Sequence, residues 1–167
     1  MQKVFLFMIA AFLSTSITQT ASAASTGEVK RAIEGIYALD EWHIQGRTLR
    51  PPQVDGRFVL QNGSVVTILL NNSDETNKTS SAQFGVFILD ETSFSYRYDT
   101  RSSFRQTPGG ILPGGAGFDG VRKFLVSVDA RVVHLKSGQQ EFIFTPEGMT
   151  YSEEGKLLRV WRRIKGE

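Results

Sequence analysis

The chain has 167 residues, of which 40% are hydrophobic and 22% charged, with a formal net charge of +2 and no cysteine. The near-balanced charge argues against a nucleic-acid partner, and the absence of cysteine excludes thiolate nucleophiles, disulfides and cysteine-ligated metals. The length is that of one domain with a sizeable core.

The N-terminal segment is typical of a secretory signal peptide. Lys3 precedes an apolar run, and the segment ends in Ala21-Ser22-Ala23, a small-x-small pattern that signal peptidase accepts. The apolar run is shorter than the roughly 20 residues that a membrane-spanning helix needs. We therefore expect cleavage near Ala23 and one domain over residues 24–167 without a membrane span. Export without disulfides favours a periplasmic or secreted bacterial protein.

The first predicted elements are a short helix and a strand. In "TGEVKRAIEG", Thr26 is the expected N-cap and Gly35 the expected stop of the helix. A strand is predicted from about Gly35 to Ile44. Further along, Asn62-Gly63 and Asp90-Glu91 each lie between two apolar, alternating stretches, and such turn pairs predict β-hairpins.

The stretch Gln106–Gly120, "QTPGGILPGGAGFDG", interrupts this pattern. It holds six of the chain's sixteen glycines and two of its five prolines. Such a composition disfavours regular structure, so the sequence predicts a mobile loop that acts as a lid or gate at the mouth of the fold.

Short strands fill the last third of the chain, in "VRKFLVSVD", "RVVHLK", "QEFIFT", "GMTYSE" and "KLLRVWRRI". The short connections between them predict antiparallel pairing. A sheet of this size with few helices to cover it is best stabilised by closing on itself. The predicted fold is therefore all-β, an up-and-down antiparallel β-barrel of about 8–9 strands with one short N-terminal helix, and a sandwich is the alternative.

Several pieces resemble the bacterial lipocalin-like domain family of the calycin superfamily. These are "GIYAL", "DGRFVLQNGSVVTILL", "FGVFIL" followed by "SFSYRYD", and "LLRVWRRI", in the family's order. The resemblance implies a barrel closed at one end and open at the other, with a cup for an apolar or amphipathic small molecule. It also implies that an arginine of the last strand stacks on an aromatic side chain of the first, at the closed end. Those residues would be Arg163 and Tyr37, with tyrosine in place of the family's tryptophan.

Glu41 and His43 are the candidate catalytic residues. Side chains alternate across a strand, so if Tyr37 faces inward, Glu41 and His43 face inward too, about 7 Å apart. Asp40 and Trp42 would then face outward. In an apolar cup, burial would raise the pKa of the carboxyl group toward neutrality and make an acid/base pair. The alternative is that the strand reaches the rim by Glu41 and both groups are solvated.

The candidate ligand-binding residues are Tyr96, Tyr98, His134 and Arg47. In "FSYRYD", Phe94 and the two tyrosines share a strand face and would form an inward aromatic ladder with phenol donors. The opposite phase would bury an ion pair. His134 lies in a strand and is either a site residue or a structural one. Arg47 follows the first strand and would meet a ligand carboxylate at the mouth or be solvated.

Three functions are open at this point. The first is an exported lipocalin-like barrel that binds a small hydrophobic or aromatic molecule. The second is a cofactor-independent lyase, isomerase or cyclase in the same cup, with Glu41 and His43 moving a proton. The third is a protein-interaction module that uses its loops. No cofactor or metal is expected, because no close-spaced ligand pattern such as HxH or HExxH occurs. The oligomeric state is not predicted.

Overall fold

One helix and twelve strands make up the described residues, which in this computed structural model are 24–115, 117 and 119–165. In chain order they are α1 (Thr26–Ile33), β1 (Gly35–Ile44), β2 (Arg47–Leu49), β3 (Val54–Gln61), β4 (Ser64–Asn71), β5 (Lys78–Leu89), β6 (Ser93–Thr107), β7 (Gly110–Pro113), β8 (Arg122–Asp129), β9 (Val132–Ser137), β10 (Gln140–Phe144), β11 (Gly148–Glu153) and β12 (Leu157–Ile164). Within these ranges no helix is long and apolar enough to cross a membrane. The predicted signal peptide lies outside the described residues.

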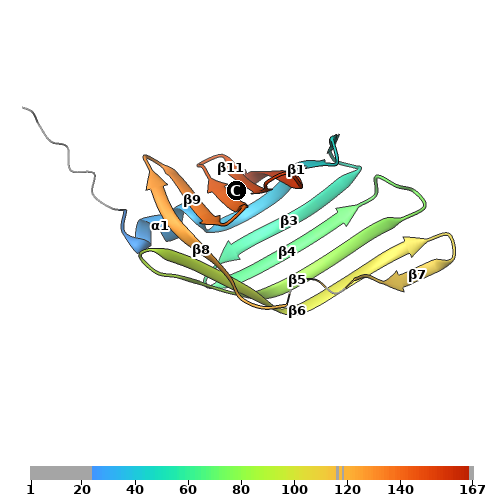
Figure 1. Ribbon diagram of the computed structural model, residues 1–167, viewed down its shortest axis with the longest axis horizontal. Coiled ribbons are helices and arrows are strands. Elements are labelled where there is room, and N and C mark those ends of the chain that lie inside the picture. Colours follow the sequence, from blue (N-terminus) through green and yellow to red (C-terminus); the bar gives the residue numbers. More distant parts are fainter. Residues whose placement is uncertain (1–23, 116, 118, 166–167) are drawn as a thin grey trace, which may run out of the picture.

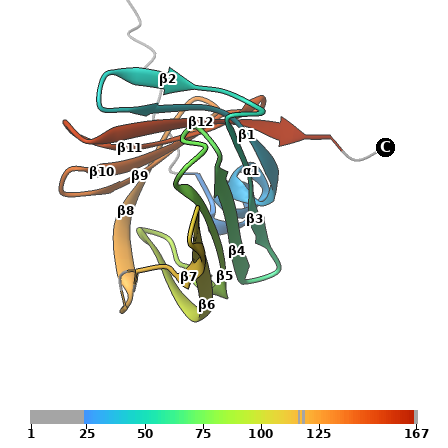
Figure 2. The ribbon, with the colours of Figure 1, turned by 90° about the vertical axis from the view of Figure 1, so that its right-hand side faces the viewer.

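The strands form a closed antiparallel barrel. The ring runs β12-β11-β10-β9-β8-β6-β5-β4-β3-β1, and β1 pairs back onto β12. Two further strands lie outside the ring: β2 pairs antiparallel with β1, and β7 pairs antiparallel with β6. In Figure 1, α1 lies at one end of the barrel and β7 at the other; Figure 2 shows β2 and β7 on opposite sides of that second end. The predicted all-β up-and-down barrel is confirmed, with ten strands in the ring rather than 8–9.

The helix α1 begins one residue before the predicted cap. Ser25 is the N-cap; its hydroxyl accepts from the Glu28 backbone N–H, and the Glu28 carboxylate accepts from the Ser25 backbone N–H at 2.8 Å. This reciprocal capping box satisfies two backbone donors at the helix start. The predicted cap at Thr26 is therefore wrong by one position. Gly35 does not stop the helix but begins β1, after a C-cap at Glu34.

Aromatic side chains dominate the core next to α1. Phe142 stacks on Phe58 with ring centroids 5.9 Å apart, and Trp161 lies 6.0 Å from Phe58. Val29 and Ile33 of α1 are buried and belong to the same hydrophobic core. The helix thus closes one end of the barrel with apolar surface, which leaves the other end for a cavity.

A β-bulge in each of two strands changes which residues face inward. On β1, Leu39 pairs with Trp161 but Glu41 pairs with Val160, so Asp40 is an extra residue. On β6, Tyr98 pairs with Gly85 and Thr100 with Phe84, so Asp99 is extra. Because side chains alternate with a period of two, each extra residue reverses the phase of everything beyond it.

Part of the predicted loop Gln106–Gly120 is regular structure, which corrects the prediction. β6 extends to Thr107, and β7 (Gly110–Pro113) pairs with it through a tight turn. Gly110 takes a φ of 123° in this turn, a conformation open to glycine. The backbone N–H of Gly114 donates to the Ser103 carbonyl at 2.8 Å. The first residue after β7 is therefore still hydrogen-bonded to β6. Two residues of the loop, Ala116 and Phe118, lie outside the described residues.

Candidate functional site

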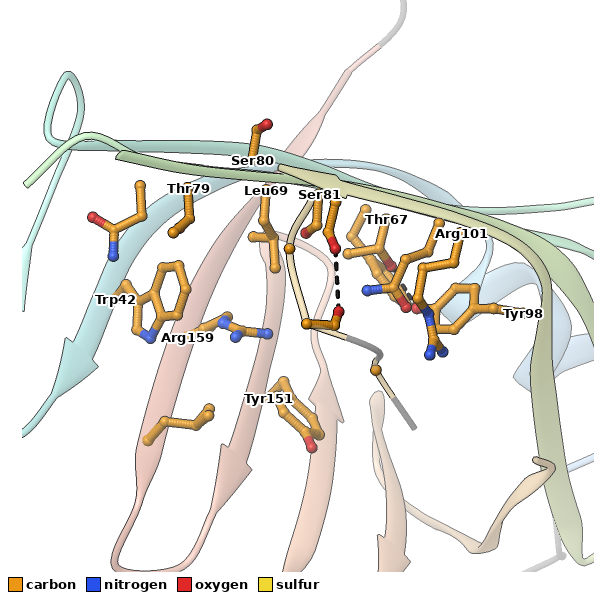
Figure 3. A pocket seen from close by; sticks show the side chains of 18 of the residues that line it. Trp42, Thr67, Leu69, Thr79, Ser80, Ser81, Tyr98, Arg101, Tyr151 and Arg159 are labelled. Atoms are coloured by element: carbon orange, nitrogen blue, oxygen red, sulfur yellow. Dashed lines mark hydrogen bonds between the residues drawn. The ribbon is translucent and has the colours of Figure 1, made fainter. Parts of the chain in front are cut away.

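A cavity of about 440 Å³ lies inside the barrel at the end that carries β7 (Figure 3). Aromatic, neutral polar, charged and aliphatic side chains and three glycines line it. The aromatic ones are Trp42, Phe58, Tyr96, Tyr98, Phe104, Phe142, Tyr151 and Trp161. The neutral polar ones are Thr67, Asn71, Thr79, Ser80, Ser81, Gln83 and Ser103, and the charged ones are Arg101, Arg105, Arg122, Arg159 and Glu153. Leu69, Met149, Leu157 and three glycines, Gly114, Gly115 and Gly117, complete the wall.

The tyrosine ladder of β6 faces this cavity. Tyr96 is 4% exposed, and its ring lies edge-on to Tyr98 with centroids 5.4 Å apart. Arg122 Nη1 donates to the Tyr96 hydroxyl at 2.8 Å, and the Tyr98 hydroxyl shares a hydrogen bond of 2.6 Å with Thr67 Oγ1. Burial raises the pKa of both phenols, so both stay neutral near pH 7.

The other face of β6 points outward. Arg97 Nε donates to Asp99 Oδ1 at 2.7 Å in an exposed pair. The alternative phase, with this ion pair inside the barrel, is excluded. The bulge at Asp99 then turns Arg101 inward, where its guanidinium lies 5.8 Å from the centroid of Tyr98.

Trp42 and Arg159 form a close cation–aromatic contact in the cavity. The guanidinium carbon of Arg159 lies 4.3 Å from the Trp42 ring centroid and 6.0 Å from that of Tyr151. Trp42 faces inward because of the bulge at Asp40. The prediction that Trp42 faces outward is therefore wrong. Arg159 was missed, although strand alternation from Trp161 would have placed it inside.

Glu41 and His43 lie on the outer face of the barrel, which corrects the prediction that both face inward. Their side chains are 24% and 37% exposed, and neither lines the cavity. His43 Nε2 lies 2.7 Å from Glu41 Oε2, and Thr48 Oγ1 lies 3.0 Å from His43 Nδ1. Arg50 donates to Glu41 Oε1 through Nε at 2.9 Å and through Nη2. Hydrogen bonds from Arg50, then His43, hold the pKa of Glu41 below its ordinary value.

His134 and Arg47 do not line the cavity either. Val133 and Leu135 are the buried residues of β9, so His134 between them points outward and its Nδ1 lies 3.1 Å from Glu141 Oε1. Arg47 begins β2 and is exposed. The structure thus brings Tyr96 and Tyr98 together at the cavity and leaves His134 and Arg47 on the outside.

Tyr37 and Arg163 meet at the closed end, next to α1. Tyr37 is fully buried, and its hydroxyl donates to the Ile33 carbonyl at 2.8 Å. Arg163 Nη2 donates to the same hydroxyl at 2.7 Å, and Nη1 donates to the Glu34 carbonyl at 2.8 Å. Burial raises the pKa of Tyr37 to about 12, against the opposing effect of Arg163.

In the described part of the chain, no three histidine, aspartate or glutamate side chains gather as metal ligands. The described residues that line the cavity supply guanidinium, phenol, hydroxyl and amide groups and the carboxylate of Glu153 around aromatic rings. Comparison of the chain with protein-family models, curated proteins and solved structures gave no match.

Proposed function

We propose that the barrel binds a small hydrophobic or aromatic molecule in its cavity, as a lipocalin-like binding protein. The observation that supports this most directly is the aromatic lining of the cavity, above all Trp42, Tyr98 and Tyr151, in a barrel whose other end is closed. A concave site of several hundred cubic ångströms whose wall carries many aromatic side chains is typical of small-molecule sites. The N-terminal signal pattern supports a periplasmic or secreted location as part of this proposal.

The enzyme alternative needed Glu41 and His43 as an acid/base pair inside the cup. Both lie on the outer face, and Glu41 is already engaged by Arg50. No observation therefore favours proton transfer in the cavity over simple binding. The outer cluster is a partly exposed network, and none of its charged residues lines the cavity.

A neutral aromatic dye, N-phenyl-naphthylamine, tests the proposal. The dye should bind the purified protein with a stoichiometry of one per chain and gain fluorescence. Leu69→Trp should weaken this binding, because Leu69 lines the cavity and the indole ring would occupy part of its volume. Leu70→Trp is the matched control, since Leu70 is the exposed neighbour on the same strand.

Equal loss of dye binding in both variants, or no binding to the wild-type protein, would contradict the proposal. A thermal melt of each variant establishes that it is folded.

A further inference from the structure

Arg159 reaches into the cavity, and no carboxylate of residues 24–115, 117 and 119–165 forms an ion pair with it. Figure 3 shows its side chain between Trp42 and Tyr151. None of the ion pairs formed by the described residues includes Arg159. The Nε atom of Arg159 is buried, and no described residue accepts a hydrogen bond from it. The groups that surround the guanidinium are thus aromatic faces and polar groups rather than a carboxylate.

The neighbours of Arg159 add no negative charge. Three phenols interact electrostatically with the Arg159 guanidinium, those of Tyr96, Tyr98 and Tyr151. Burial raises the pKa of each phenol, so all three are neutral near pH 7. Arg122 carries the same sign of charge as Arg159. Burial lowers the pKa of Arg159, but a guanidinium remains charged at neutral pH.

The one carboxylate among the described lining residues is Glu153. Its carboxylate accepts a hydrogen bond from Lys156 Nζ, the largest cause of its lowered pKa, and the charge of Arg122 lowers that pKa further. No carboxylate of the described residues, Glu153 included, forms an ion pair with Arg159. A buried cation without a counter-charge is costly, and an anion that enters the site would offset this cost.

We infer that the cavity takes an anionic ligand, a carboxylate, sulfonate or phosphate carried on an aromatic or apolar body, and that Arg159 binds the anionic group. The body of the ligand lies against the tyrosines of β6, where a flat ring gains aromatic contact. Arg101 and Arg105 line the cavity nearer to β7 and would attract the anion toward the mouth. This inference rests on the proposed function, because it requires that the cavity binds a ligand.

Two dyes that differ in one group separate the inference from the proposed function. Anilinonaphthalene sulfonate has the same aromatic body as N-phenyl-naphthylamine and adds a sulfonate. Isothermal titration of the wild-type protein should give one site per chain for each dye, with tighter binding of the sulfonate. Arg159→Met, which keeps the length of the side chain but removes the charge, should weaken sulfonate binding by roughly 10- to 100-fold. It should weaken binding of the neutral dye much less, so that the ratio of the two affinities falls by about tenfold or more.

Arg162→Met is the matched control, since Arg162 lies on the same strand but is exposed on the outer face. It should leave the affinity for both dyes unchanged. Equal affinity of Arg159→Met and wild type for the sulfonate would overturn the inference, as would a parallel loss of both dyes. If the wild-type protein binds the neutral dye but not the sulfonate, the inference fails and the proposed function stands. If it binds neither, the proposed function fails as well.

A competition experiment on the wild-type protein serves if Arg159→Met does not fold. Naphthoate and naphthalene methanol have the same ring system, and the first carries a carboxylate where the second carries a neutral alcohol. Naphthoate should displace the neutral dye at a concentration about tenfold lower than the alcohol. Displacement at equal concentrations would overturn the inference.

Discussion

The guanidinium carbon of Arg163 lies 5.0 Å from the ring centroid of Tyr37, and Arg163 Nη2 donates to the hydroxyl of that same tyrosine. The arginine also donates to the backbone carbonyls of Ala32 and Glu34, at the C-terminal end of α1. One side chain of the last strand therefore binds both the first strand and the end of the helix. Carbonyls at a helix end lack intrahelical partners, and a cation there satisfies them.

Arg163→Met should lower the free energy of unfolding by about 2–4 kcal/mol, because it leaves two helix carbonyls and the Tyr37 hydroxyl without their charged donor. Urea denaturation followed by tryptophan fluorescence measures the change. The control is Arg162→Met on the outer face, for which we expect a change within about 0.5 kcal/mol. Equal effects of the two substitutions would show that the contacts of Arg163 do not stabilise the fold.

The protein should lose stability as the pH rises from 10 to 12. In the unfolded chain a tyrosine loses its proton near its ordinary pKa of about 10, whereas burial raises the pKa of Tyr37 to about 12 in the folded state. Tyr37 thus stabilises the fold fully below pH 10, and this contribution of up to about 3 kcal/mol is lost as the pH rises toward 12. Tyr37→Phe should make the alkaline decline of the melting temperature shallower than in the wild type. An identical pH profile for both proteins would contradict this assignment.

Gly85→Ala should destabilise the barrel by more than about 3 kcal/mol. An added Cβ at Gly85 would lie 1.9 Å from the Arg97 carbonyl oxygen and 2.7 Å from the Tyr98 Cα, and both of those are backbone atoms. Gly109→Ala is the matched control, because its Cβ would meet only the Thr107 hydroxyl at 3.8 Å. The measurement is the urea midpoint of each variant. A wild-type midpoint for Gly85→Ala would mean that the bulge beside it relaxes freely.

Arg50→Ala should raise the pKa of Glu41 toward its ordinary value, since Arg50 provides the larger part of the lowering. The stabilisation that the lowered pKa represents is present above pH 4.5 and is lost as the pH falls through the folded pKa. NMR titration of the Glu41 carboxyl carbon measures the pKa in both proteins.

The same variant should bind N-phenyl-naphthylamine as tightly as the wild type, because neither Arg50 nor Glu41 lines the cavity. A weaker affinity of Arg50→Ala for the dye would show that the outer network acts on the cavity after all.

The architecture could be predicted from the sequence because its signals are local. Asn62 and Gly63 have φ values of 50° and 78°, the conformation that makes this pair a hairpin turn. Alternation along β6 also placed Tyr96 and Tyr98 on one face, and both line the cavity. The short helix was predictable for the same reason, since a capping residue and the first turn lie next to each other in the chain.

The inner face of β1 could not be predicted in the same way, because its phase depends on a partner far away in the sequence. The extra residue at Asp40 is defined only by the pairing of Leu39 with Trp161 and of Glu41 with Val160. A rule of strict alternation carries Tyr37 inward correctly and then fails for every residue beyond the bulge. For this reason Trp42 faces the cavity, whereas Glu41 and His43, which strict alternation predicts to face inward, do not.

The pairing of β1 with β12 also sets the order in which the barrel can form. Every other pair in the ring joins strands that are neighbours in chain order within the ring, whereas Ile36 must find Ile164. Closing this longest loop has the largest entropic cost, so we expect the seam to form last and to limit the folding rate. Until it forms, β1 and β12 are two open edges, each able to pair with a strand of another molecule. The contacts of Arg163 with Tyr37 across that seam hold the two edges together once the barrel has closed.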